Sequence, residues 1–441
     1  MLLTLAAVLA LDGADKGSVG AMAEPLQHAF HIGTTDFGLL LTVSLGTAAG
    51  ATFVFGSFVD RTNRVRLLAW TTAGWAVAIA LSACATSYLF LLLSRIALGA
   101  ITASAAPAIA SLIGDYFPTQ ERGGVYSSVL GGEVLGSGAG FLLSGELANW
   151  TWRAAFGALA ILAVVLARVV HALPEPRRGG GGSFSSRRQK HHQSSSSSKQ
   201  IVRESGAPPR PELVLKKDPS DRSLWWVLRY VLRVPTNRIL IVASALAYFY
   251  FTGLRAFGVE YLRVWLRVGH TAAVILMILA GSGALVGVLI SGRSADRLLA
   301  GGRPNARILV ACVAYFATTG LFALSLLTRA IWLELPLLVL AAAALGAISP
   351  PLDAARLDIM HPSLWGRAES VRTCLRKAAE AAAPISFGYV AEHVYGHATG
   401  GGLHATFFLM LIALGVGGGV GLFALRSYPR DVATVVASRT T

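Results

Sequence analysis

The sequence has few charged residues and few cysteines. Asp, Glu, Lys and Arg make up 14% of its 441 residues, whereas 54% are hydrophobic. Soluble globular proteins carry about 25% charged residues, so this composition excludes an ordinary soluble domain and indicates a membrane protein. The three cysteines are far apart and form no Cys-x-x-Cys pair, so neither a disulfide framework nor a zinc site is expected.

The motifs of several enzyme classes are also absent. The chain has no Gly-x-x-x-x-Gly-Lys-Ser/Thr phosphate loop, no His-Glu-x-x-His zinc motif and no Ser/His/Asp set. The glycines of Gly131-Gly-x-x-x-Gly136-x-Gly138-x-Gly140 follow no strand, so we interpret them as a surface for close helix packing rather than a dinucleotide loop. We therefore expect a protein that is not an enzyme and needs no cofactor.

Apolar runs of about 20 residues follow one another along the chain. At ~1.5 Å per residue, a helical run of this length crosses a ~30 Å hydrocarbon layer, and a helix satisfies its own backbone hydrogen bonds there. Met1–Leu11 has no basic start and leads directly into charged residues, so we expect a first helix rather than a signal peptide. We predict an all-α membrane protein with 12 transmembrane helices, at 2–28, 36–58, 66–86, 88–114, 122–145, 152–172, 237–258, 270–291, 307–328, 332–357, 366–392 and 402–425.

The net charge of +15 is concentrated in particular loops. Between Pro174 and Arg238 there are 14 Lys and Arg but only five Asp and Glu. Because basic loops of membrane proteins stay in the cytoplasm, we predict a multi-pass protein of the cell membrane with both termini cytoplasmic. The charge then reflects topology and contact with membrane lipids, and no nucleic-acid partner is expected. The other basic turns are 59–66, 120–123, 293–307 and 361–372.

Composition divides the chain into five parts. Segments 1–174 and 237–426 each hold six predicted helices, and 427–441 is predicted to be a cytoplasmic tail. Residues 175–222 are polar, basic and poor in aromatic residues, so we expect a disordered linker in the cytoplasm. In 223–236, apolar residues surround arginines at a spacing of four, which predicts an amphipathic helix at the membrane surface.

Two charged turns occur twice, once in each half. Gly56-Ser-Phe-Val-Asp60-Arg61 is similar to Gly292-Arg-Ser-Ala-Asp296-Arg297. Asp115-Tyr-Phe-Pro118-Thr-Gln-Glu-Arg122 is similar to Asp358-Ile-Met-His-Pro362-Ser-Leu-Trp-Gly-Arg367. Repeats at matching positions indicate a transporter built from two related parallel halves.

These turns resemble the signature loops of the major facilitator superfamily of transporters, as do Arg95-x-x-x-Gly99 and Trp150-Thr-Trp152-Arg153-Ala-Ala-Phe156. The resemblance implies a monomer with two pseudo-symmetric six-helix bundles that rock about a central cavity. It also implies that Asp60 meets the start of span 11, near Arg367 or Arg372, and that Asp296 meets the start of span 5, near Arg122. These contacts would close the cytoplasmic side. The candidate gating residues are Gly56, Asp60, Arg61, Arg64, Asp115, Arg122, Asp296, Arg297, Asp358 and Arg367.

Charged residues inside the predicted spans indicate a functional site, because each costs roughly 2.5–3.5 kcal/mol at a helix centre. Asp12, Asp15 and Lys16 can share one helix face. We expect Asp15 or Glu133 to bind a proton in one conformation and to pair with Arg95 in the other. A fixed ion pair that only holds helices together is the alternative. The candidates for substrate binding and proton coupling are Asp12, Asp15, Lys16, Arg95, Glu133, Arg255 and Glu380.

Within the superfamily, the segment from Leu11 to Ala21 resembles the first span of spinster-type lipid transporters, with Asp15 and Lys16 at the positions of an Asp-Arg pair. The aromatic run Tyr248–Phe251 suits an amphipathic solute. The predicted substrate is therefore a lysolipid or lipid-like anion, moved by proton-coupled alternating access. The alternatives are a proton-coupled exporter of drugs or organic anions and a non-transporting sensor or scaffold.

Overall fold

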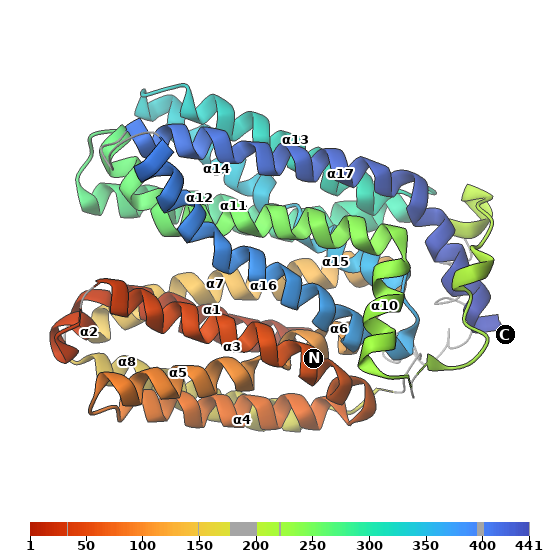
Figure 1. The fold of residues 1–441 in the computed structure, drawn as a ribbon, viewed down its shortest axis with the longest axis horizontal. Coiled ribbons are helices and arrows are strands. Elements are labelled where there is room, and N and C mark those ends of the chain that lie inside the picture. Colours follow the sequence, from red (N-terminus) through yellow and green to blue (C-terminus); the bar gives the residue numbers. More distant parts are fainter. Residues whose placement is uncertain (33, 149, 177–200, 220–221, 395–400, 441) are drawn as a thin grey trace.

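The computed structural model consists of helices and short helical turns, and contains no strand in the part of the chain that it describes. The predicted all-α fold class is confirmed. Figure 1 shows the helices running side by side along the long axis of the molecule. The described residues are 1–32, 34–148, 150–176, 201–219, 222–394 and 401–440.

The helices of the first half coincide with the predicted segments, but two segments are divided. The predicted segment 2–28 is divided into two helices at Met22, and the segment 88–114 is divided into two helices at Ala103–Ser104. Pro107 lies in the first turn of the helix that follows the second break, where its missing N–H costs nothing. The elements are α1 (Leu2–Ala21), α2 (Ala23–Phe30), α3 (Thr34–Arg61), α4 (Arg64–Ala83), α5 (Tyr88–Thr102), α6 (Ala105–Tyr116), the 3-10 turn η1 (Thr119–Glu121), α7 (Arg122–Ala148) and α8 (Trp152–His171).

The second half repeats this order. Its predicted segment 332–357 is divided where the 88–114 segment is, and Pro350 and Pro351 again occupy the first turn after the break. The matching breaks support two related halves. The elements are η2 (Pro211–Leu213), α10 (Leu224–Arg233), α11 (Pro235–Trp265), α12 (His270–Ala300), α13 (Ala306–Leu326), α14 (Ile331–Gly346), α15 (Ser349–Asp358), η4 (Pro362–Leu364), α16 (Trp365–Tyr389), the π-helical turn η5 (Val390–Val394) and α17 (Gly401–Thr440).

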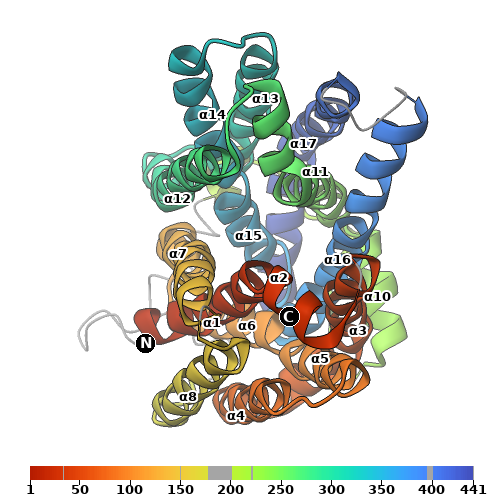
Figure 2. The same ribbon diagram turned by 90° about the vertical axis from the view of Figure 1, so that its left-hand side faces the viewer.

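The helices form two bundles. Helices α1–α8 lie together in the lower part of Figure 1, and α11–α14 and α17 lie together in the upper part, an arrangement that Figure 2 repeats from the end of the molecule. Between the bundles, α3 packs against α16 and α7 packs against α12. The turns before α4, α7, α13 and α16, which are rich in basic residues, all lie toward the right of Figure 1, and we call this the basic end.

Glycines bring α1 and α7 into close contact. A Cβ atom at Gly132, Gly136 or Gly140 would clash with the backbone of α1. The residues of α1 that contact these glycines are Ala6, Ala10 and Ala14. The structure therefore agrees with the interpretation of the Gly131–Gly140 motif as a surface for close helix packing.

Eight helices or helix pairs are long and apolar enough to cross a membrane by length and composition. The remaining predicted spans coincide with α1, α3, α7 and α16, which this criterion does not select in the described residues. Three of them, α1, α7 and α16, contain the candidate charged residues.

The linker and the tail differ from the sequence prediction where the structure describes them. Helix α17 continues through Pro429 to Thr440, and residues 201–219 lie against this extension. Arg210 Nε is 2.9 Å from Asp431 Oδ1, and the Leu215 amide donates to Ser438 Oγ at 2.9 Å. Side-chain oxygens along the helix thus accept bonds that a free linker would give to water. Residues 177–200 lie outside the described ranges.

The predicted helix at 223–236 is present as α10. Ser223 caps its first turn by accepting a bond from the Trp226 amide. The rings of Trp226 and Tyr230 stack at 5.2 Å, and Trp225 is 73% exposed. An exposed tryptophan suits a membrane surface, so the interfacial position of α10 stays a prediction that this geometry supports.

Candidate functional site

The first group of charges lies halfway along α1 and α7. Lys16 Nζ is 2.5 Å from Asp12 Oδ2, one helical turn earlier, and 3.0 Å from Glu133 Oε1 of α7. About a third of the Lys16 side chain is exposed, as are 26% of Asp12 and 31% of Glu133. Water therefore reaches these charges although they lie far from the ends of their helices. One ammonium thus pairs with two carboxylates.

A second pair, between α1 and α5, is buried. Arg95 Nη1 of α5 is 3.0 Å and 3.2 Å from the two carboxylate oxygens of Asp15. The guanidinium also lies over the ring of Phe156, 4.5 Å from its centroid. Arg95 Nη2 has no hydrogen-bond partner in the described part of the chain. The predicted proximity of Asp15 and Arg95 is thus present, whereas Glu133 pairs with Lys16 and not with Arg95.

Helix α16 brings further charges to the first group. Arg376 Nε is 3.3 Å from Glu380 Oε1, one turn later, and its guanidinium lies over the Tyr248 ring at 4.1 Å. Lys16 interacts electrostatically with Glu380, and Asp12 interacts with Lys377, across the space between the two bundles. We call Asp12, Lys16, Glu133, Arg376, Lys377 and Glu380 the central cluster.

Arg255 lies apart from the central cluster, and its part in substrate binding stays a prediction. Its side chain is exposed and stacks on Phe251 of its own helix, 5.6 Å from the ring centroid. An apolar run shows that a charged residue lies in a membrane span, but it does not show which neighbouring helices the side chain faces. Arg376 was missed, although its spacing of four from Arg372 and Glu380 could have identified a charged face on this helix.

A chain of ion pairs leads from the central cluster toward the basic end. Arg356 of α15 pairs with Asp353 and with Glu369 of α16. Arg372 Nη2 is 2.5 Å from Glu369 Oε1, and Arg372 Nη1 is 3.5 Å from Asp353 Oδ1. All four side chains are buried. The positions 369, 372, 376 and 380 therefore form a continuous charged face along α16.

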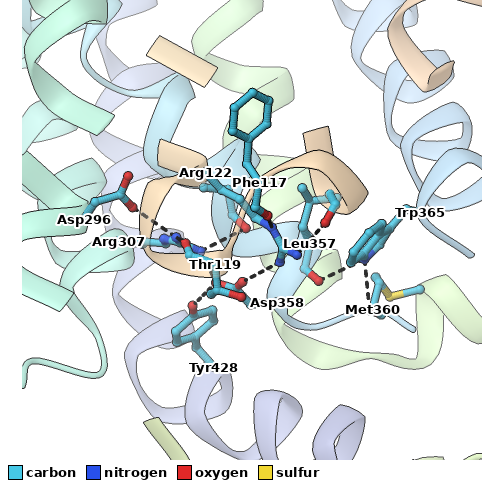
Figure 3. Close-up of polar contacts among 12 residues, drawn as sticks. Phe117, Thr119, Arg122, Asp296, Arg307, Leu357, Asp358, Met360, Trp365 and Tyr428 are labelled. Atoms are coloured by element: carbon cyan, nitrogen blue, oxygen red, sulfur yellow. Dashed lines mark hydrogen bonds and ion pairs between the residues drawn. The ribbon is translucent and has the colours of Figure 1, made fainter. Parts of the chain in front are cut away.

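At the basic end, charged residues of both bundles meet in a buried group (Figure 3). Asp358 pairs with Arg307 and accepts a bond from the Tyr428 hydroxyl at 2.7 Å. Arg122 of α7 reaches the same carboxylate from the other bundle, 3.4 Å away, and lies over the Trp365 ring at 4.8 Å. Arg122, Asp296, Arg307, Asp358 and Tyr428 are called the basic-end cluster below.

Asp296 connects this cluster to the start of α7, as the sequence predicts. Its Oδ2 accepts a bond from the Gly124 amide at 2.7 Å, and its Oδ1 is 3.1 Å from Arg307 Nη2. A carboxylate at a helix N-terminus is stabilised by unsatisfied amides and by the helix dipole. Arg307 also donates to the Thr119 carbonyl, so it spans both bundles. The sequence analysis missed Arg307, which lies at the edge of an apolar run like an ordinary basic loop residue.

A similar Arg-Asp pair is present in the first half. Arg64 pairs with Asp115 and donates to Glu175 Oε1 at 2.8 Å and to Ser111 Oγ at 2.9 Å. Arg367 of the second half, at the start of α16, is buried and donates to the carbonyl of Arg222, 2.9 Å away, in the segment before α10. Each bundle thus builds an Arg-Asp pair, and Arg122 contacts the pair of the second half from the other bundle.

Three gating candidates cannot be placed by their side chains. Gly56, Asp60 and Arg61 belong to the last turns of α3, and their side chains lie outside what the structure describes. The contact predicted between Asp60 and the start of span 11 therefore stays a prediction, although α3 and α16 do pack together. Arg297 is exposed on α12.

Comparison with known proteins identifies the family. The model of the Major Facilitator Superfamily matches residues 5–384. A sphingosine-1-phosphate transporter, SPNS2, of Danio rerio is 29% identical over 176 residues, which are 38% of this chain and 34% of that protein. A gallate transporter of Pseudomonas putida is 26% identical over 174 residues, 39% of this chain and 38% of that protein. The chain thus spans well under half the length of these curated relatives.

Solved structures match over nearly the whole chain. The transporter FucP in its outward conformation has a TM-score of 0.71 at 10% identity and covers 96% of this chain and 98% of its own. A bacterial homologue of the human lysosomal transporter Spinster, facing inward and unoccupied, has a TM-score of 0.56 at 18% identity, with 98% and 97% covered. At these identities the likeness establishes the fold, with its two six-helix bundles.

Proposed function

This chain belongs to the major facilitator superfamily and is a multi-pass membrane transporter of that fold, and we propose that it moves an amphipathic organic solute by proton-coupled alternating access. The observation that carries the proposal is the contrast between a sealed basic-end cluster and a partly exposed central cluster. A solute site halfway across the membrane must open to one side at a time. The proposed open side is the one opposite the basic end.

The buried contacts between the bundles support this arrangement. Asp296 on the Gly124 amide and Arg122 on Asp358 join the bundles at the basic end. Opening this end requires both contacts to break, so they are proposed to hold the gate shut until the bundles rock. By the positive-inside rule the basic end is proposed to face the cytoplasm, with both termini on that side of the cell membrane.

Two carboxylates are proposed to carry the proton. Asp15 is paired with a buried guanidinium, and its release from Arg95 would leave a carboxylate away from water that favours the protonated form. Glu133 shares Lys16 with Asp12, so movement of Lys16 toward either one exposes the other. Each arrangement couples a proton to a shift of α1 against its neighbours. A fixed structural pair is the competing interpretation.

The proposed solute is a lysolipid or a lipid-like anion. The partial match to a sphingosine-1-phosphate transporter supports a single-chain lipid with an acidic head group. The gallate transporter supports the alternative, a small organic anion, and an exporter of drugs or organic anions is kept with it. Both relatives handle acidic molecules, so an anion is the property that the two proposals share.

Flux into proteoliposomes tests the proposal. Purified protein is reconstituted, a pH gradient is imposed, and uptake of radiolabelled lysophosphatidate is compared with uptake of benzoate. We expect lysophosphatidate flux that rises with the gradient, and loss of that dependence in Asp15→Asn but not in Asp36→Asn, an exposed carboxylate at the start of α3. Uptake of benzoate alone would favour the organic-anion alternative, and binding without flux would indicate a sensor.

A further inference from the structure

Lys377 is the cation of the central cluster that lacks an ionic partner in the described part of the chain. Asp12 and Glu133 both lie within 3.0 Å of Lys16, and Glu380 lies 3.3 Å from Arg376. All three carboxylates of the cluster are thus taken by the other two cations. Lys377 interacts with Asp12 and Glu380 only at longer range, and Lys16 is a further cation among its neighbours.

The position of Lys377 makes this arrangement costly for the protein alone. The residue is half-buried on α16, twelve residues from the start of that helix. An ammonium inside a membrane protein normally pairs with a carboxylate or faces a polar pathway, because burial without a partner costs several kcal/mol. Lys377 has no carboxylate partner in the described residues and lies beside the partly exposed charges of the central cluster, so its ammonium is suited to an external anion.

We propose that Lys377 binds the acidic head group of the solute, and that the solute is a single-chain amphipathic anion with a phosphate or carboxylate. This inference rests on the proposed transport function and names the residue that recognises the substrate. The Arg376 guanidinium lies one residue earlier, and its Nε makes no hydrogen bond of good geometry.

A group of aromatic rings on α16 and α11 lies beyond the central cluster. Phe387 follows Glu380 by seven residues and lies on the same helix face, about 10 Å farther from the basic end. Its ring is 5.8 Å from Phe249 and stacks on Phe257 at 6.4 Å, both on α11. Phe249 and Phe257 are only partly buried, so their free surfaces can receive the hydrocarbon chain.

Binding of two probes that share one acyl chain tests the assignment. Oleoyl lysophosphatidate carries an acidic phosphate, and monoolein is neutral. Affinity for each is measured with the full-length protein in nanodiscs for wild type, Lys377→Gln, Lys377→Arg and the control Lys217→Gln, an exposed lysine outside the bundles. We expect Lys377→Gln to weaken lysophosphatidate binding about tenfold and to leave monoolein unchanged, since a lost charged contact affects only the acidic probe. Lys377→Arg and Lys217→Gln should bind both probes like wild type.

The outcomes separate this inference from the transport proposal. Equal weakening of both probes in Lys377→Gln, or no weakening of lysophosphatidate, overturns the role of Lys377. A Lys377-dependent preference for lysophosphatidate without flux in proteoliposomes keeps the binding site and overturns transport. Flux of lysophosphatidate that Lys377→Gln leaves unchanged keeps transport and overturns the site.

Discussion

The central cluster and the basic-end cluster contain the same kinds of side chain in opposite surroundings. In the basic-end cluster the side chains of Arg307 and Asp358 are 0% exposed, and each charge contacts several partners. In the central cluster Lys16 and Glu133 are about one third exposed, and one cation serves two carboxylates. The first group is buried and its charges pair with one another, whereas the second is partly exposed and shares one cation between two carboxylates.

This difference separates charges that stabilise the fold from charges that can change partners during transport. Breaking a buried ion pair leaves an uncompensated charge and costs about 3–5 kcal/mol, whereas an exposed pair contributes about 0–1 kcal/mol. The same chemical change should therefore affect stability strongly at the basic end and weakly in the centre. The loss of stability caused by removing a charge should therefore decrease as the exposure of that charge increases.

Removing the charge of Asp358 should be the most damaging single change. Asp358→Asn leaves Arg307 buried beside a neutral amide and weakens the contact with Arg122. We expect a loss of about 3–5 kcal/mol, because the Arg307 guanidinium keeps its desolvation cost and retains only Asp296 as an ionic partner. The melting temperature in detergent, followed by intrinsic fluorescence, measures the change.

The control for this variant is Asp36→Asn, which neutralises an exposed carboxylate at a helix start. It should cost no more than about 1 kcal/mol. A double variant, Asp358→Asn with Arg307→Met, removes both buried charges and should recover part of the loss. Equal melting temperatures for Asp358→Asn and Asp36→Asn would contradict the view of a sealed cluster.

A steric change at Gly114 should open the same end without altering charge. An added methyl group would clash with the Trp365 ring, which is fixed by bonds from its Nε1 to the Leu357 and Met360 carbonyls. Overpacking of this kind costs about 1–3 kcal/mol. In Gly114→Ala we expect faster hydrogen exchange of peptides covering 119–130, since the Gly124 amide loses its bond to Asp296.

Gly138→Ala is the matched control for this change. Gly138 belongs to α7, and no atom lies within 4 Å of an added Cβ at that position. Its exchange in 119–130 should equal that of wild type. Slow exchange in Gly114→Ala would mean that Trp365 moves aside and that the bundles do not separate.

The sequence predicted the fold well because the apolar runs and the repeated turns are local signals. The helix boundaries, the close packing of the Gly131–Gly140 segment and the contact of Asp296 with the start of α7 all follow from them. The rotation of a helix about its axis is set by tertiary packing, so the sequence could not place Arg255 relative to the central cluster, and Arg376 was omitted. Arg307 was missed because the sequence alone does not distinguish a buried arginine with several partners from an exposed arginine in a loop.

The ion pair between Arg210 and Asp431 of α17 has intermediate exposure, so its loss should have an intermediate effect on stability. Arg210 is a quarter exposed and Asp431 is buried. We expect Arg210→Gln to lower stability by about 1 kcal/mol, since Asp431 keeps its bond from the Thr236 amide. Deleting 179–199 should leave the melting temperature unchanged, whereas deleting 179–215 should lower it at least as far as Arg210→Gln. Equal values for the two deletions would show that residues 201–215 add nothing to stability.

Lys16→Gln should have the smallest effect on stability and a large effect on transport. The side chain is about one third exposed, so its loss should cost less than about 1 kcal/mol. Asp12 and Glu133 then lose the cation that lies within 3.0 Å of both, so the exchange of Lys16 between them that is proposed for coupling is removed. We expect lysophosphatidate flux under a pH gradient to fall about tenfold, with Lys217→Gln unchanged. A fall in melting temperature as large as that of Asp358→Asn would place Lys16 among the structural charges and remove the distinction between the clusters.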